Sequence, residues 1–184
     1  GQAGFGKYRS NGYTRWSDIS QGLPDRKILV YGPPSTSGTR DAFVELGMEK
    51  GASAYTLLKD IKSKNEPRFK QLTGAMREDG RYVDAGENDN ATLSILTKTP
   101  DSLGIFGYSF YVENRDKVKV AKIGGFLPTP EDIASGDYPL SRSLYIYVKK
   151  AHLTLVPGLT GYMNEFVSDA AAGQGGYLKA RGLI

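Results

Sequence analysis

The stretch from Gly32 to Phe43, which reads GPPSTSGTRDAF, carries residue types that could bind an anion. Ser37 stands where a helix N-cap belongs, and Gly38 lets a ligand approach the backbone because it has no Cβ. Thr39 adds a second hydroxyl, and Arg40 places a guanidinium in the first helical turn. Hydroxyls, a guanidinium and the backbone N–H groups of a helix N-terminus together suit a small oxyanion. The sequence therefore predicts an oxyanion site at residues 37–40.

The position of Arg40 supports this interpretation. A capping box would place Glu or Gln three residues after Ser37, but the chain has an arginine there. A cation in the first turn faces the positive end of the helix dipole, which costs a few tenths to about 1 kcal/mol. Asp41 offsets part of this cost, and a bound anion would remove it. The plainer alternative is a Ser-capped helix whose Arg40 points to solvent.

Two catalytic motifs are absent from this loop. It lacks the closing Gly-Lys-Ser/Thr of a Walker A loop, and no Gly-x-Ser-x-Gly surrounds Ser37. An enzyme hypothesis, a phosphatase or phosphotransferase with Ser37 or Thr39 as nucleophile, would need a neighbouring base. His152 is the only histidine, and we expect it to be structural or on the surface. A module without ligand, in which the loop is vestigial, is the third alternative.

Composition narrows the function classes further. The chain has 184 residues, 24 basic and 20 acidic, with a net charge of +4 and no cysteine. Thiolate catalysis and disulfides are excluded, and no pattern suggests a metal or another cofactor. The cations are scattered, so we expect no nucleic-acid partner. The longest apolar runs, such as 103–106 and 144–148, are too short to span a membrane. The N-terminus does not resemble a signal peptide, which fits a cytosolic protein, a processed exported one or a fragment.

The elements that must position the loop alternate between strands and helices. A β-favouring run at 27–32 precedes the loop, and a helical pattern with Ala42, Phe43 and Leu46 on one face follows it. This alternation predicts an α/β architecture with a largely parallel sheet flanked by helices. Trp16 is expected in the core, and the aromatics at 108, 110, 145 and 147 are expected to pack in strands. Further along the chain we predict helices at 55–64, 91–98 and 159–167, strands at 81–85, 103–111 and 143–150, an irregular stretch at 123–137, and a final helical turn near 176–181.

Several motifs in order resemble a known family. GPPSTSGTRDAFVEL is preceded by TRWSDIS and followed by GENDN, LGIFGYSFY and YPLSRSLYIYVKK. This set resembles PstS-type phosphate-binding proteins, the substrate-binding components of phosphate ABC transporters. The resemblance implies a type II periplasmic-binding-protein-like fold, phosphate held between two lobes, and no catalysis. It also implies a periplasmic location and partnership with the ABC permease and ATPase subunits.

The resemblance also implies which residues bind phosphate. Ser37, the backbone N–H of Gly38, and Thr39 match the family loop. Many members have an arginine four residues before the serine, where this chain has Pro33, so we assign that role to Arg40. Further residues that could line the same cleft are Thr36, Asn88 and Asp89, although an ordinary helix cap is the simpler explanation of the last two.

The resemblance covers only part of a family member. Residues 1–138 are similar to the second, phosphate-loop lobe, and residues 139–184 to the return segment that completes the first lobe. We therefore expect a fragment or short homologue whose return segment packs on a missing N-terminal lobe, on a separate chain or in a homodimer. Because the family's proton acceptor for phosphate belongs to the first lobe, we expect this chain alone to bind weakly and to discriminate poorly against sulfate.

Overall fold

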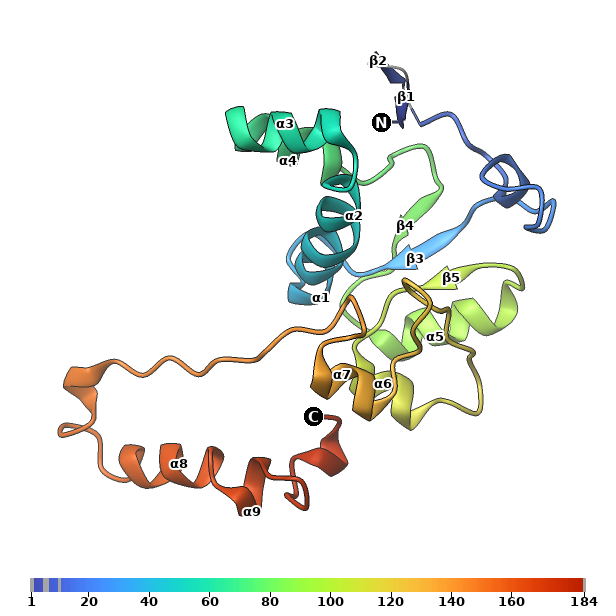
Figure 1. Cartoon of the computed structure of the whole chain (residues 1–184). Coiled ribbons are helices and arrows are strands. Elements are labelled where there is room, and N and C mark those ends of the chain that lie inside the picture. Colours follow the sequence, from blue (N-terminus) through green and yellow to red (C-terminus); the bar gives the residue numbers. More distant parts are fainter. Residues whose placement is uncertain (1, 5–6, 10, 184) are drawn as a thin grey trace. The chain divides into compact units, whose positions relative to one another are not determined.

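The computed structural model of the protein describes residues 2–4, 7–9 and 11–183. The chain divides into two compact units, Gly1–Gly107 and Tyr108–Ile184 (Figure 1). Each unit has its own helices, and each is described by itself below. The assignment of 1–138 and 139–184 to two lobes of a larger protein stays a prediction.

A three-stranded parallel sheet organises the first unit. Strand β3 (Val30–Gly32) lies in the centre, between β4 (Tyr82–Asp84) and β5 (Leu103–Gly104). Val30 pairs with Tyr82 on one side and with Leu103 on the other. The predicted strands at 27–32 and 81–85 are confirmed, and so is the α/β class with a parallel sheet.

Helices lie on both sides of this sheet (Figure 1). The first turns of three of them are capped by the side chains of Ser37, Asn65 and Asn88, which accept from backbone N–H groups that have no partner within the helix. The helices are α1 (Gly38–Ala42), which continues through the π-helix η2 (Phe43–Glu49) into α2 (Lys50–Ala52), then α3 (Thr56–Lys64), α4 (Glu66–Thr73) and α5 (Asp89–Lys98).

The core of the first unit is small. Phe69 of α4 is fully buried, and Leu58, Leu93 and Ile28 are also buried. Trp16 is only half-buried, and its Nε1 donates a hydrogen bond to the Asp101 carbonyl at 3.2 Å. The remaining elements of this unit are the antiparallel pair β1 (Gln2–Gly4) and β2 (Lys7–Arg9) and the 3₁₀ turn η1 (Trp16–Asp18).

The sequence prediction is partly wrong at 103–111. The strand ends at Gly104, and residues 108–113 form a helix. Tyr108 and Tyr111 then lie on one helical face, with ring centroids 6.1 Å apart. A short apolar run fits the period of a helix as well as that of a strand, so the aromatic content did not decide between them.

The second unit consists of short helices. Helix α8 agrees with the predicted helix at 159–167. Helix α7 falls in the stretch that we expected to be irregular, where Thr129 caps it by accepting from the Asp132 amide at 3.1 Å. The elements are α6 (Tyr108–Glu113), α7 (Pro130–Ser135), η3 (Lys150–His152), α8 (Leu159–Phe166), α9 (Asp169–Ala172) and η4 (Lys179–Arg181).

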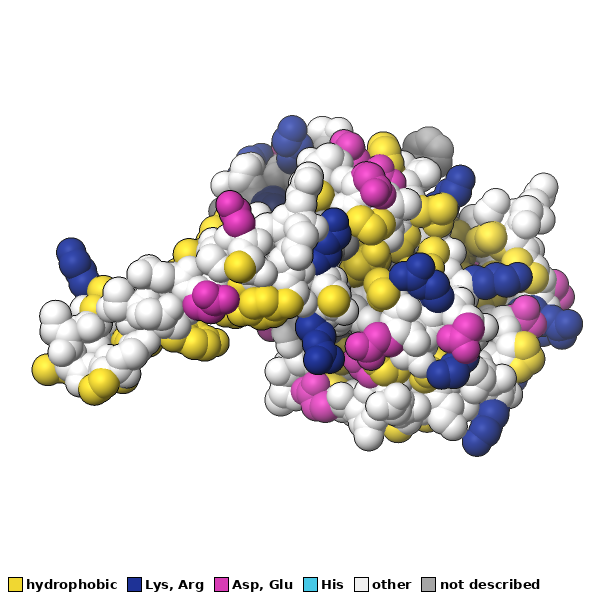
Figure 2. Space-filling view, turned by 90° about the horizontal axis from the view of Figure 1, so that it is seen from below, with side chains coloured by type: hydrophobic (Ala, Val, Ile, Leu, Met, Phe, Trp, Pro, Cys, Tyr) yellow, Lys and Arg dark blue, Asp and Glu magenta, His cyan; other side chains and the backbone are white. Residues whose placement is uncertain are grey.

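The predicted strand at 143–150 is not a strand in this structure. Residues 141–149 lie in neither a helix nor a sheet, and residues 150–152 form η3. Tyr145 and Tyr147 are 74% and 90% exposed. A strand exists only when a neighbour completes its hydrogen bonds, and the described residues provide none for this segment. Figure 2 shows hydrophobic side chains on the surface of the part of this unit that carries α8.

Candidate functional site

The candidate oxyanion loop lies at the carboxyl edge of the parallel sheet. Residues 33–37 connect the end of β3 to α1, and residues 85–88 connect the end of β4 to α5. The two connections meet, because the Thr36 hydroxyl donates to the Glu87 carboxylate at 2.9 Å. Ligands of open α/β sheets bind at this edge, outside the carboxyl ends of the strands.

Ser37 forms the cap that the sequence predicts. Its backbone is extended (φ −87°, ψ 130°), and its Oγ accepts from the Thr39 amide at 3.2 Å. The residue is only 8% exposed, and its own amide donates to the Pro34 carbonyl at 3.0 Å. The Thr39 amide is therefore already used within the protein. A hydroxyl can donate while it accepts, so the cap does not prevent the Ser37 proton from reaching a ligand.

Arg40 is half-buried at the same helix end and is not directed freely into solvent. Its guanidinium carbon lies 5.2 Å from the centroid of the Tyr82 ring, within the range of a cation–π contact. The Arg40 guanidinium is not held in a salt bridge by any carboxylate that the structure describes.

Tyr82 also forms a hydrogen bond with the loop itself. Its hydroxyl donates to the Pro33 carbonyl at 2.6 Å. Burial raises the pKa of the Tyr82 phenol, and the nearby charge of Arg40 partly opposes that increase. The phenol thus stays protonated and remains a donor.

Two glycines of the loop differ in their surroundings. A Cβ on Gly32 would lie 2.5 Å from the Tyr82 hydroxyl, so the close approach of the ring requires glycine there. A Cβ on Gly38 would meet no atom within 4 Å. The space in front of Gly38 is therefore open to a ligand.

Helix capping accounts for most of the polar contacts in the turn after β4. Asn88 Oδ1 accepts from the amides of Asn90 and Ala91 at 3.0 and 3.2 Å, which agrees with the simpler explanation of this residue. Asp89 is half-buried in the first turn of α5. Burial and the negative charge of Glu87 raise the pKa of Asp89. Glu87 was not among the predicted site residues, since only the folded chain brings it to Thr36.

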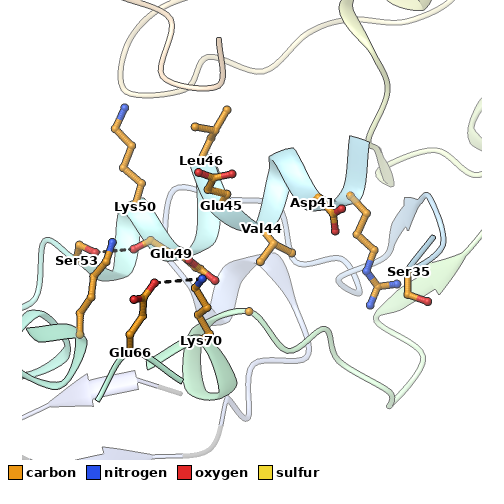
Figure 3. A pocket seen from close by; sticks show the side chains of 13 residues that line it. Ser35, Asp41, Val44, Glu45, Leu46, Glu49, Lys50, Ser53, Glu66 and Lys70 are labelled. Carbon is orange, nitrogen blue, oxygen red and sulfur yellow. Dashed lines mark hydrogen bonds and ion pairs between the residues drawn. The ribbon is translucent and has the colours of Figure 1, made fainter. Parts of the chain in front are cut away.

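A cavity of about 660 Å³ lies beside the loop, along α1, η2 and α2 (Figure 3). Ser35 and Arg40 line its wall, together with acidic and basic side chains from α4. Glu66 pairs with Lys70 there at 3.1 Å and is the main cause of the raised pKa of Lys70. Because its lining carries charges of both signs, this cavity has no clear preference for anions.

Among the described residues of the first unit, no basic side chain is hydrogen-bonded to Ser37 Oγ, which accepts from a backbone amide. His152 lies in η3 of the second unit. Across the described residues, no group of three or more His, Asp or Glu side chains could hold a metal ion. The same residues include no helix whose length and apolar character would let it cross a bilayer.

Relatives of the chain share this part of the fold. A family model described as a PBP superfamily domain matches residues 8–170. The phosphate-binding protein PstS of Staphylococcus epidermidis is 32% identical over 170 residues, which cover 89% of this chain and 44% of the relative. PstS of Staphylococcus aureus is 31% identical over 172 residues, which cover 90% of this chain and 44% of the relative. These relatives are binding proteins by name, and the chain spans less than half of their length.

Two crystal structures are similar to the protein. One is described as a possible phosphate binding protein from Planctomyces limnophilus; it has a TM-score of 0.55 and 29% identity, over 86% of this chain and 49% of the other. PstS from Borrelia burgdorferi has the same TM-score, over 92% of this chain and 56% of the other. Because its sequence identity is only 22%, this similarity supports the fold alone. The chain thus belongs to the PBP superfamily, and it spans only part of the length of the PstS proteins that it resembles.

Proposed function

We propose that the chain binds inorganic phosphate at residues 37–40, as part of the substrate-binding protein of a phosphate ABC transporter. The observation that carries the proposal is the guanidinium of Arg40, which lies beside the capped N-terminus of α1 and forms no salt bridge with the described carboxylates. The openness in front of Gly38 gives an anion access to the same helix end. The names of the relatives support phosphate as the anion.

In this proposal the donors act together on one tetrahedral ion. The Ser37 and Thr39 hydroxyls and the Gly38 backbone N–H contact phosphate oxygens, and the Arg40 fork supplies the charge. Thr36 and Asp89 lie at the edge of the site, while Asn88 serves the α5 cap. The protein acts by binding and release and performs no reaction on the ion.

The remaining organisation of the transporter system is proposed from the family. Residues 1–138 are the phosphate-loop lobe, and residues 139–184 return to the other lobe of a two-lobed clamp. The complete clamp would work in the periplasm and present phosphate to the permease and ATPase subunits. Closure of two lobes on a ligand is the switch that such docking needs.

The exposed side chains of the proposed return segment support this organisation. Residues 143–149 form no ladder with any other part of the chain that the structure describes, and Leu144, Tyr145 and Tyr147 are exposed by 68% or more. A separate chain or a second copy of the protein could cover the same residues, and an experiment can separate these cases. We expect the amides of 143–149 to exchange rapidly in the isolated chain. They should become protected when the chain is joined to the part of the S. epidermidis relative outside the 170 matched residues.

The binding test is calorimetry with phosphate and sulfate at fixed ionic strength. We expect weak binding of both ions by the isolated chain, and binding that is weaker by about tenfold or more in the Arg40→Ala variant. Thermal melting with the same ions is a second readout, because a ligand that binds only the folded state raises the melting temperature. Absence of any phosphate effect in both measurements would overturn the proposal. Sub-micromolar affinity with firm rejection of sulfate would overturn the role assigned to the other lobe.

A further inference from the structure

Tyr82 contacts three parts of the candidate site from a neighbouring strand. It begins β4, where it pairs with Val30 of β3. Its ring packs against the backbone of Gly32, its hydroxyl donates to the Pro33 carbonyl at 2.6 Å, and its face lies 5.2 Å from the Arg40 guanidinium. One side chain thus connects the end of β3, the loop and the first turn of α1.

Arg40 needs such a contact if it is to stay beside the loop. Its backbone lies in the first turn of α1, where the positive end of the helix dipole repels a cation. An arginine side chain is also long and loses much rotational freedom when it is held in one place. An aromatic face attracts a guanidinium and limits its positions, which opposes both effects.

The tyrosine is itself fixed. The Pro33 hydrogen bond restrains its hydroxyl end, and the absence of a Cβ at Gly32 lets its ring approach the backbone of β3. A phenylalanine in its place would keep the ring face but lose the tie to Pro33. A leucine would lose both.

We propose that Tyr82 is the positioning residue for Arg40, holding the guanidinium where an oxyanion at residues 37–40 would meet it. This inference rests on the proposed function, because it assigns the anion contact of Arg40 to a geometry that Tyr82 maintains. Tyr82 itself does not touch the anion.

The test compares phosphate affinities of five variants with the wild-type chain: two at Tyr82, Arg40→Ala alone and with Tyr82→Leu, and a control. We expect Tyr82→Leu to bind about fivefold more weakly, and Tyr82→Phe to stay within about threefold of wild type, because it keeps the ring face. In an Arg40→Ala background, Tyr82→Leu should have no further effect. Tyr55→Leu, at an exposed tyrosine of the same unit, is the matched control and should bind as wild type does.

Proton chemical shifts provide a readout that does not depend on binding. The Arg40 side-chain signals should show a ring-current shift in wild type and in Tyr82→Phe. The shift should disappear in Tyr82→Leu. If that variant does not fold, the wild-type and Tyr82→Phe spectra still decide, since an unshifted Arg40 in either would overturn the inference.

The outcomes separate the two proposals. If wild type does not bind phosphate, the proposed function fails, whereas the chemical shifts still report whether Tyr82 holds Arg40. If wild type binds phosphate but Tyr82→Leu binds equally well, the positioning role is wrong. Equal losses from Tyr82→Leu with and without Arg40 would also contradict it, because the effect would then not act through Arg40.

Discussion

The backbone of Gly32 and the ring of Tyr82 are packed so closely that a Cβ on residue 32 would lie 2.5 Å from the phenol oxygen. The contact joins the end of the central strand to its neighbour β4 at the edge where the candidate loop begins. It therefore links the stability of the sheet to the geometry of the site.

Gly32→Ala should destabilise the first unit, because the ring or the strand must move to admit the methyl group. We expect a fall of about 1–3 kcal/mol in the free energy of unfolding, which denaturant titration would measure. Gly38→Ala is the matched control for stability, since its methyl group meets no atom within 4 Å. Gly38→Ala should instead weaken phosphate binding, because the methyl group occupies the approach to the backbone. Equal stability of the two variants would contradict the packing argument.

Arg40→Ala should weaken phosphate binding by about tenfold to a hundredfold, the loss expected when a charged hydrogen bond of about 1.5–3 kcal/mol is removed. Arg115→Ala is the control for general charge attraction. Arg115 is exposed in the second unit, and its Nε donates to the Val112 carbonyl at 3.2 Å. Calorimetry at constant ionic strength should show little change for that variant. Similar losses in both would indicate diffuse attraction and not a site.

Arg77→Ala should affect stability more than phosphate affinity. Arg77 donates to the Tyr13 carbonyl and pairs with Asp79, so it holds the segment before β4 in place. We expect a lower melting temperature and an affinity close to that of wild type. A loss of affinity as large as that of Arg40→Ala, in a variant that is still folded, would show that the loop is not the main anion site.

Ser37→Ala should lower the free energy of unfolding by about 1 kcal/mol, the usual cost of losing an N-cap. Asn65→Ala is a matched cap variant, since Asn65 accepts from the Arg68 amide at 3.0 Å at the start of α4. The two variants should lose similar stability, but only Ser37→Ala should lose phosphate affinity. If neither affects binding, Ser37 is a cap and nothing more.

Asp89→Asn should raise the melting temperature near pH 7. Burial and Glu87 raise the pKa of Asp89 above its ordinary value of 3.8, so the folded state binds the proton more tightly than the unfolded state does. Stability from this group is present below pH 3.8 and is lost as the pH rises through the raised pKa. The gain in the variant is therefore expected at neutral pH and should vanish in acid. It should be small, because the α5 dipole favours a negative charge in the first turn.

Asp79→Asn should change stability in the opposite direction to Asp89→Asn. The hydrogen bonds from Arg77 hold the pKa of Asp79 below 3.8. Its stabilising effect is thus present above pH 3.8 and is lost as the pH falls through the lowered pKa. We expect the variant to melt lower than wild type at pH 7 and to approach it in acid. Parallel pH profiles for the two variants would contradict both assignments.

Local signals were sufficient to predict the unit that carries the loop. The β-favouring run at 27–32 and the serine cap at Ser37 each act over a few residues, and both are confirmed. The predicted apolar face of Ala42, Phe43 and Leu46 falls largely in the π-helix η2, and none of these three residues is fully buried. Helix α4 was missed, although Asn65 followed by Pro67 is a usual start of a helix. The apolar pattern of this helix is hard to recognise in the sequence, because Phe69 is its one buried residue and several of its neighbours are charged.

Contacts between distant residues could not be predicted in this way. The stacking of Arg40 on Tyr82 depends on the order of strands in the sheet, and the Thr36–Glu87 bond depends on two connections that meet only in the folded chain. The strand predicted at 143–150 was wrong for a different reason. Its composition favours a strand, but pairing requires a neighbour that the described residues do not supply.

The exposed residues at 143–149 also affect how readily the purified chain aggregates during storage. Residues 143–149 form no ladder with another described segment, and their exposed tyrosines alternate, which makes this stretch a template for cross-β stacking. Lys149 and Lys150 stand at its end, and their mutual repulsion slows such growth at low salt. Raising the salt screens that repulsion, so concentrated samples should form filaments sooner in high-salt buffer than in dilute buffer.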